Sequence, residues 1–291
     1  IDLYVSQLGG YYDPEAKYFV MAAWMPMLLQ SSVAVHELTH AVQDQHYALD
    51  KFVDQKIENS DLLLARSALI EGDATAVMMD AVNIKAGLPR MIEMDGVESI
   101  ITQNILGASL SGAMSGVPNS LQVMVLFPYS SGLRFAHYLL RRGGYPEIDK
   151  AFVRSPRSTE EILHPEQYFN DQPGFRVIAP EEVFDKGWGE VIFKDTLGEF
   201  MLSALLSNIS SAKIRNAQAA AGWGGDTLVV QKSLTKPGEK LLSWKIEWDS
   251  SVDNLEFMKI YAPYLKEREQ SGENISVAQD DKSVLIRIEL K

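Results

Sequence analysis

Two histidines and a glutamate stand close together in the stretch VAVHELTHAVQ, as His36-Glu37-Leu38-Thr39-His40. An α-helix turns by about 100° per residue, so residues four apart lie about 40° from each other and both imidazoles would project from one face. Two neutral imidazoles placed in this way can bind Zn²⁺. Glu37 would lie at the edge of that face, where its carboxylate can take a proton from a water molecule polarised by the ion. The spacing predicts a zinc site with a general base, provided that a third ligand exists.

A catalytic zinc ion takes three protein ligands and leaves one position open. His46 follows His36 by ten residues, but Gln43 stands where a glycine would have to break the helix. On an unbroken helix, His46 would point about 80° away from His36, on the side opposite to His40. Glu71, in ALIEGDA, is a carboxylate within a helical pattern rich in apolar residues, where burial without a partner is costly. A solvated Glu71 is the alternative, and we expect Glu71 rather than His46 to be the third ligand.

Patterns of apolar residues predict the helices that would carry these ligands. We expect one helix over 31–47, beginning at one of two serines, and a second over 61–86 that a glycine ends. Gly72 is unfavourable inside the second helix, so it predicts the close approach of another backbone. A third helix is expected over 130–143, after an uncharged connection that covers 99–128.

The second half of the chain has a different pattern, because strand-like runs appear between helices. We therefore predict an α+β fold, with a mainly helical catalytic region over 1–170 and an α+β region over 171–291 that is a second domain or part of the same one. The expected strands cover 190–193, 227–231, 241–248 and 283–290, and the expected helices lie at 145–153, from 158 to before Pro165, near 195–221 and at 252–268.

Composition limits the classes of partner. The 291 residues include 27 Lys and Arg against 39 Asp and Glu, a formal net charge of −12 without a basic cluster, which argues against nucleic acid. The uncharged stretches 18–35 and 99–133 are interrupted by proline or glycine, so we expect no transmembrane segment. The absence of cysteine excludes thiolate ligands. The composition is compatible with a secreted, periplasmic or anchored protein, and it leaves the oligomeric state open.

HELTH on one helix followed by EGDA on the next resembles the gluzincin group of zinc metallopeptidases, to which thermolysin and the aminopeptidase-N type belong. The resemblance implies a zincin-like core, a peptide or protein substrate, and Zn²⁺ held by His36, His40 and Glu71. It also implies that Glu37 is the general base and then the proton shuttle.

The chain also resembles a poorly characterised bacterial metallopeptidase family over roughly residues 10–230. The position after GWGGD holds Thr227 where that family is expected to have arginine. The motifs that carry the resemblance are YYDPEAK, HELTHAVQDQH, ALIEGDA, FPYSSG, STEEILHPEQY and GWGGD.

Two residues are candidates for stabilising the oxyanion that forms during peptide hydrolysis. Tyr129 precedes the expected third helix and could place its hydroxyl near the ion; the alternative is a buried aromatic that opens the helix. His164 follows a short helix and precedes a proline; the alternative is an imidazole that bonds the last carbonyls of that helix.

Three further predictions concern the surroundings of the site. Asp44, one turn after His40, could orient an imidazole, or it could be an ordinary exposed aspartate. His137 is expected to be a packing histidine. Residues 17–22 are expected to form a strand, either an edge strand along which an extended peptide binds or an interior strand without a ligand.

Two classes of function therefore compete. The first is a zinc metallopeptidase, and the second is a catalytically inactive zinc-binding scaffold or binding protein with the same fold. Zinc-dependent hydrolysis of a non-peptide amide is a third possibility that uses the same residues.

Overall fold

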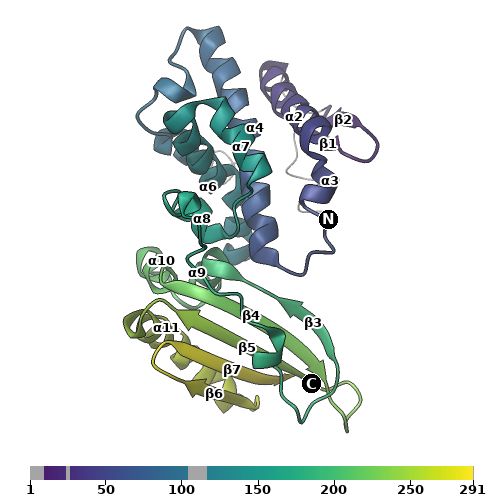
Figure 1. Ribbon diagram of the computed structural model, residues 1–291, viewed down its shortest axis with the longest axis vertical. Coiled ribbons are helices and arrows are strands. Elements are labelled where there is room, and N and C mark those ends of the chain that lie inside the picture. Colours follow the sequence, from purple (N-terminus) through teal and green to yellow (C-terminus); the bar gives the residue numbers. More distant parts are fainter. Residues whose placement is uncertain (1–9, 24–26, 104–116, 291) are drawn as a thin grey trace. The chain divides into compact units, whose positions relative to one another are not determined.

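The computed structural model describes residues 10–23, 27–103 and 117–290, which form two compact units of mixed helix and strand (Figure 1). Unit 1 comprises Ile1–Gln55, Leu63–Arg157 and Glu161–Pro165, and unit 2 comprises Lys56–Leu62, Ser158–Glu160 and Glu166–Lys291. The predicted α+β class is confirmed. Unit 2 differs from the predicted region 171–291 in that it begins at Glu166 and also takes two short earlier segments, Lys56–Leu62 and Ser158–Glu160.

Unit 1 is mainly helical, with one hairpin. Strands β1 and β2 pair antiparallel, and both contact helix α2. The chain then continues through α3, α4 and the short turn η1 to α6, which contacts α7. The bounds are β1 Gly10–Asp13, β2 Tyr18–Met21, α2 Met27–Tyr47, α3 Leu49–Phe52, α4 Ser60–Ala86, η1 Met91–Glu93, α6 Asn119–Gly143, α7 Tyr145–Val153 and α8 Thr159–Leu163.

Two predicted helix starts are wrong. Helix α2 begins at Met27, a turn before the serines expected to start it, because the segment 27–30 contains no residue that ends a helix. Helix α6 begins at Asn119 and runs through Pro128. Ser130 looks like an N-terminal cap in the sequence, but its hydroxyl donates to the carbonyl of Leu126 at 2.8 Å and is part of a continuing helix.

Helices α4 and α6 cross at two glycines, and the close backbone approach predicted from Gly72 is confirmed. A Cβ atom on Gly72 would lie 2.1 Å from the carbonyl oxygen of Gly132, and one on Gly132 would lie 2.1 Å from the carbonyl oxygen of Ala68. No side chain fits at either position, so the two backbones are in direct contact beside Glu71.

Unit 2 contains a five-stranded antiparallel sheet in the order β3-β4-β5-β7-β6. The predicted strands over 241–248 and 283–290 agree closely with β5 and β7, whereas β6 was not predicted and the helix expected near 195–221 is two helices. The bounds are η2 Gln167–Phe169, η3 Pro180–Glu182, β3 Val191–Asp195, α9 Gly198–Ile209, α10 Lys213–Ala220, β4 Trp223–Lys232, β5 Lys240–Trp248, α11 Ser251–Gln270, β6 Ile275–Gln279 and β7 Ser283–Leu290.

Alternate residues of β5 and β7 pack against helices α9, α10 and α11 and form the main core of unit 2 with them. Trp244, Ile246 and Trp248 of β5 pack with Phe257 and Tyr261 of α11 in this cluster. A smaller cluster on β4 includes Val229, which is covered by the segment around Ile178 and Val183. Within the described ranges, no helix has the length and apolar character needed to cross a bilayer.

Candidate metal site

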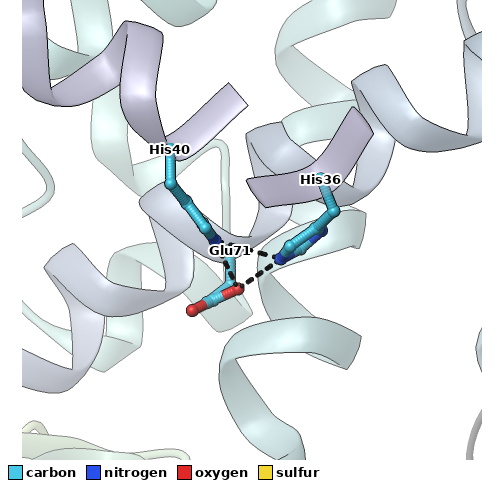
Figure 2. A group of neighbouring side chains, drawn as sticks. All are labelled: His36, His40 and Glu71. Atoms are coloured by element: carbon cyan, nitrogen blue, oxygen red, sulfur yellow. Dashed lines mark hydrogen bonds and ion pairs between the residues drawn. The ribbon is translucent and has the colours of Figure 1, made fainter. Parts of the chain in front are cut away.

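Helices α2 and α4 bring the three predicted ligands together (Figure 2). The Nε2 atom of His36 lies 3.1 Å from Oε2 of Glu71, and Nε2 of His40 lies 3.4 Å from the same oxygen. The two Nε2 atoms are 3.0 Å apart. Two nitrogens and one carboxylate oxygen therefore converge on one small volume, which is the donor set of a three-ligand zinc site. In the described part of the chain, no other His, Asp or Glu belongs to such a group.

The i, i+4 spacing explains how α2 presents both imidazoles to α4. Their ring centroids are 4.6 Å apart with an interplanar angle of 90°, so the rings meet edge to face. The side chains of His36 and His40 are 11% and 10% exposed, and that of Glu71 is 22% exposed. The three side chains are therefore largely shielded from bulk water.

The charges of the three groups are strongly coupled. Burial of His40 lowers the pKa of its imidazole, but the Glu71 carboxylate outweighs this effect and raises that pKa to about 9. Burial raises the pKa of Glu71, and the imidazoles oppose it and hold the carboxyl pKa at about 2. An anion fixed beside two imidazoles requires a positive charge between them, and either a proton or a divalent cation can supply it.

Glu37 is next to the metal group without belonging to it. Its side chain is buried against the hairpin, where a Cβ atom on Gly10 would lie 3.3 Å from the Cγ atom of Glu37. Burial raises the pKa of the Glu37 carboxyl, and His40 and His36 act in the opposite direction. A carboxyl group with a raised pKa beside a cation site is suited to accepting a proton and then donating it.

Gln43, which was not predicted to belong to the site, contacts His40 on the Nδ1 side of its ring. The Nδ1 atom of His40 lies 2.9 Å from Oε1 of Gln43, and Nε2 of Gln43 donates to the Asp73 carboxylate at 2.7 Å and to the carbonyl of Ile70 at 3.1 Å. Gln43 and Asp73 are both buried. The only indication in the sequence was the position of Gln43. It stands where a glycine would have to break the helix if His46 were to be a ligand.

Neither alternative predicted for Asp44 is correct, because the residue is buried and its described partners include no imidazole. Its carboxylate accepts hydrogen bonds from the Tyr12 hydroxyl at 2.8 Å and from the Leu49 backbone at 3.2 Å, and it forms an ion pair with Lys17 at 2.6 Å. Asp44 therefore fixes the hairpin and α3 to the C-terminal half of α2.

The predicted oxyanion donors are in different situations. The ring of Tyr129 stacks on that of His36, with centroids 6.3 Å apart, and the residue is 37% exposed. His164 follows α8 and is half-buried, outside the metal group.

The other two histidines lie outside the metal group as well. His46 is exposed at the end of α2. Nε2 of the buried His137 donates to the carbonyl of Met94 at 3.0 Å, so His137 is the packing histidine that was predicted.

A cavity of about 470 Å³ opens beside the metal group, with His40 and Glu71 in its wall. Apolar side chains from α3 and α4 line part of it, and three acidic residues, Glu15, Asp50 and Asp54, line another part. The strand expected over 17–22 is β2, and in the part of the chain that the structure describes it pairs with β1 alone and is an edge strand.

Two of the motifs outside the metal group have structural roles in unit 2. In GWGGD, the buried Asp226 accepts hydrogen bonds from the indoles of Trp223 and Trp244 at 3.0 and 2.9 Å and from the first backbone N–H of α9, that of Gly198, at 2.9 Å. In STEEILHPEQY, the Thr159 backbone donates to the buried Asp61 at 2.9 Å. These carboxylates hold helix ends and loops, with no described link to the metal group.

A model for a family described as Domain of unknown function (DUF8575) matches residues 187–289. The matched stretch contains all five strands of the unit 2 sheet and none of the three metal-group residues. Comparison with curated proteins and with solved structures gave no match. The similarity therefore concerns unit 2, and the chemistry of unit 1 has to be argued from its geometry.

Proposed function

We propose that the chain is a zinc-dependent metallopeptidase with a zincin-like, gluzincin-type site in unit 1. The observation that carries the proposal is the convergence of Nε2 of His36, Nε2 of His40 and Oε2 of Glu71, with Glu37 beside them. This combination would supply three ligands and a general base, and three protein ligands leave one position of a tetrahedral ion for water or substrate. Zinc bound there would polarise a carbonyl group and lower the pKa of water.

Each residue then has a defined task. His36, His40 and Glu71 hold the ion, and the carboxylate reduces its net charge. Glu37 takes a proton from the attacking water and passes it to the leaving amine, a cycle that its raised pKa supports. Tyr129, stacked on His36 at the rim of the group, is the proposed donor to the oxyanion.

The substrate would be a peptide or protein segment. The cavity beside His40 and Glu71 can take one of its side chains. Among the strands of the described residues none pairs with the exposed β2 on the side away from β1, so that edge could pair with a peptide backbone. Hydrolysis of another amide would use the same groups, and a panel of unstructured peptides distinguishes the two.

The deciding experiment compares wild type with Glu37→Gln. We expect about one zinc per chain in both proteins, cleavage of unstructured peptides by wild type that a chelator abolishes, and a loss of about 10²- to 10⁴-fold in the variant. Retained cleavage by Glu37→Gln would show that the mechanism is wrong. Zinc in both proteins without cleavage by either would favour the inactive zinc-binding scaffold.

A further inference from the structure

The environment of Gln43 is unusual for a glutamine on an amphipathic helix. It is 3% exposed, and both ends of its amide have partners. One end contacts the ring of His40 one turn earlier on α2, and the other contacts α4 at Ile70 and Asp73. Since Ile70 and Asp73 flank Glu71, this one side chain links the two helices that carry all three predicted zinc ligands.

The partners of Gln43 fix the orientation of its amide. A backbone carbonyl can only accept a hydrogen bond, so the group 3.1 Å from the oxygen of Ile70 has to be the NH₂ of Gln43. The Asp73 carboxylate, 2.7 Å from the same nitrogen, also acts as an acceptor. The oxygen Oε1 is therefore the atom that faces His40, at 2.9 Å from Nδ1.

The orientation of the amide in turn determines the proton on His40. An oxygen without hydrogen can only accept, so Nδ1 of His40 has to carry its proton. The lone pair of a neutral His40 is then on Nε2, the atom that lies 3.0 Å from Nε2 of His36 and 3.4 Å from Glu71. The chain of contacts from Asp73 to Gln43 to His40 aims the metal-binding lone pair at the other two ligands.

We infer that Gln43 is a positioning residue, which selects the Nδ1–H form of His40 and sets the spacing between α2 and α4 at the metal group. Asp73 acts through Gln43, by holding its amide in the orientation that accepts the His40 proton. The inference rests on the proposed function only in naming zinc as the ion, because the orientation of the imidazole exists with or without it.

The test uses Gln43→Met, which keeps the length of the side chain and removes the amide, and Asp73→Asn, which keeps an acceptor and removes the charge. Asp80→Asn is the matched control, because Asp80 is also buried on α4 but bonds the Met91 backbone and the Tyr145 hydroxyl. One readout is the zinc dissociation constant from chelator competition. The other is the ¹H–¹⁵N signal of His40 Nδ1–H, measured with and without zinc.

We expect Gln43→Met to weaken zinc binding by about 10- to 100-fold and to make the His40 Nδ1–H proton exchange rapidly with water. Asp73→Asn should give a smaller loss, and Asp80→Asn should match wild type. Zinc affinity in Gln43→Met equal to that of the control would overturn the inference. If Gln43→Met does not fold, the wild-type spectrum decides, because a rapidly exchanging Nδ1–H would contradict the bond to Gln43.

These readouts separate the inference from the proposed function. A protein that binds zinc and cuts no peptide loses the proposed activity and keeps the role of Gln43. A protein that binds no zinc loses the proposed function, while the Nδ1–H signal of the metal-free chain still tests the contact between Gln43 and His40.

Discussion

The carboxylate of Glu71 reaches both imidazoles, whereas His46, the other residue at ligand spacing, is exposed at the end of α2. Glu71 supplies the single negative charge of the group, and it does so from a helix position with few polar neighbours. At the scale of residues, Glu71 differs from His46 in bringing a negative charge to the imidazoles. Replacing each candidate ligand with neutral glutamine can test which of them binds the ion.

We predict that Glu71→Gln loses zinc while His46→Gln retains it. The amide of a glutamine is a weak zinc ligand and leaves the positive charge of the ion uncompensated, so the affinity should fall by more than about 100-fold. Metal analysis after dialysis measures the outcome. Equal zinc content in Glu71→Gln and wild type would remove Glu71 from the ligand set.

Tyr129 can be tested by removing only its hydroxyl. In Tyr129→Phe the ring can still stack on His36, so we expect unchanged zinc content and a kcat lower by about 100-fold, the cost of losing one oxyanion donor. Steady-state kinetics on one peptide measure it. A kcat close to that of wild type would mean that the ring contributes packing alone.

At the scale of elements, the position of Glu71 depends on how closely α4 and α6 approach. The two glycines at their crossing leave no room for a methyl group, and Glu71 directly precedes one of them. The hairpin β1–β2 is held to α2 in a different way, through the ion pair and hydrogen bonds of Asp44.

Gly72→Ala should force the helices apart. A methyl group 2.1 Å from a carbonyl oxygen cannot be accommodated without backbone movement, and we expect a loss of stability of about 1–3 kcal/mol together with weaker zinc binding. Denaturant unfolding and chelator competition measure the two effects. Gly87→Ala is the control, because nothing lies within 4 Å of a Cβ at Gly87, although its positive φ adds strain.

The ion pair and hydrogen bonds of the Asp44 carboxylate predict that the folded protein loses stability in acid. Burial raises the pKa of this carboxyl, but the hydrogen bonds from Lys17, Tyr12 and Leu49 outweigh it and lower the pKa below its usual value. The stabilising contribution is therefore present above the pKa of an unfolded aspartate and is lost as the pH falls through the lower pKa of the folded state.

In the metal-free protein, Asp44→Asn should lose about 1–3 kcal/mol at pH 7 relative to wild type, and the difference should shrink as the pH approaches 3. Denaturant unfolding followed by circular dichroism at several pH values measures it. Asp50→Asn, which changes an exposed aspartate on the adjacent α3, serves as the comparison. A difference that is constant with pH would exclude the proposed ion pair as its source.

The sequence predicted those features that depend on local pattern or local spacing. The metal group is one, because i, i+4 spacing on α2 and an unpartnered carboxylate on α4 are both visible in the letters. The start of α6 was not predictable from caps alone, since Ser130 bonds within the helix that it was expected to begin. The link through Gln43 depends on which side of α4 faces α2, and residue spacing within one helix does not contain that information.

At the scale of the whole molecule, charge is the dominant property. The chain carries a formal net charge of −12, and three acidic side chains line the cavity beside the metal group. A field of one sign around a binding cavity attracts substrates of the opposite sign and repels those of the same sign.

We predict that peptides rich in Lys or Arg are cleaved with kcat/KM at least about 10-fold higher than peptides rich in Asp or Glu at low salt. Raising the ionic strength should reduce this ratio, because salt screens exposed charges. Asp50→Lys should also reduce it, because Asp50 lines the cavity. Equal kcat/KM values at low salt would contradict the prediction.

Two indoles donate hydrogen bonds to Asp226 in the core of unit 2, and the gathering of tryptophans in this unit has a practical consequence for spectroscopy. Of the five tryptophans, Trp223, Trp244 and Trp248 are buried in the core of unit 2, and Trp188 also belongs to that unit, while Trp24 lies outside the described residues. Intrinsic fluorescence should therefore be dominated by the unit that does not carry the metal group. Emission from those three indoles offers a built-in reference for the integrity of unit 2, while the absorbance of bound cobalt follows ion uptake in unit 1.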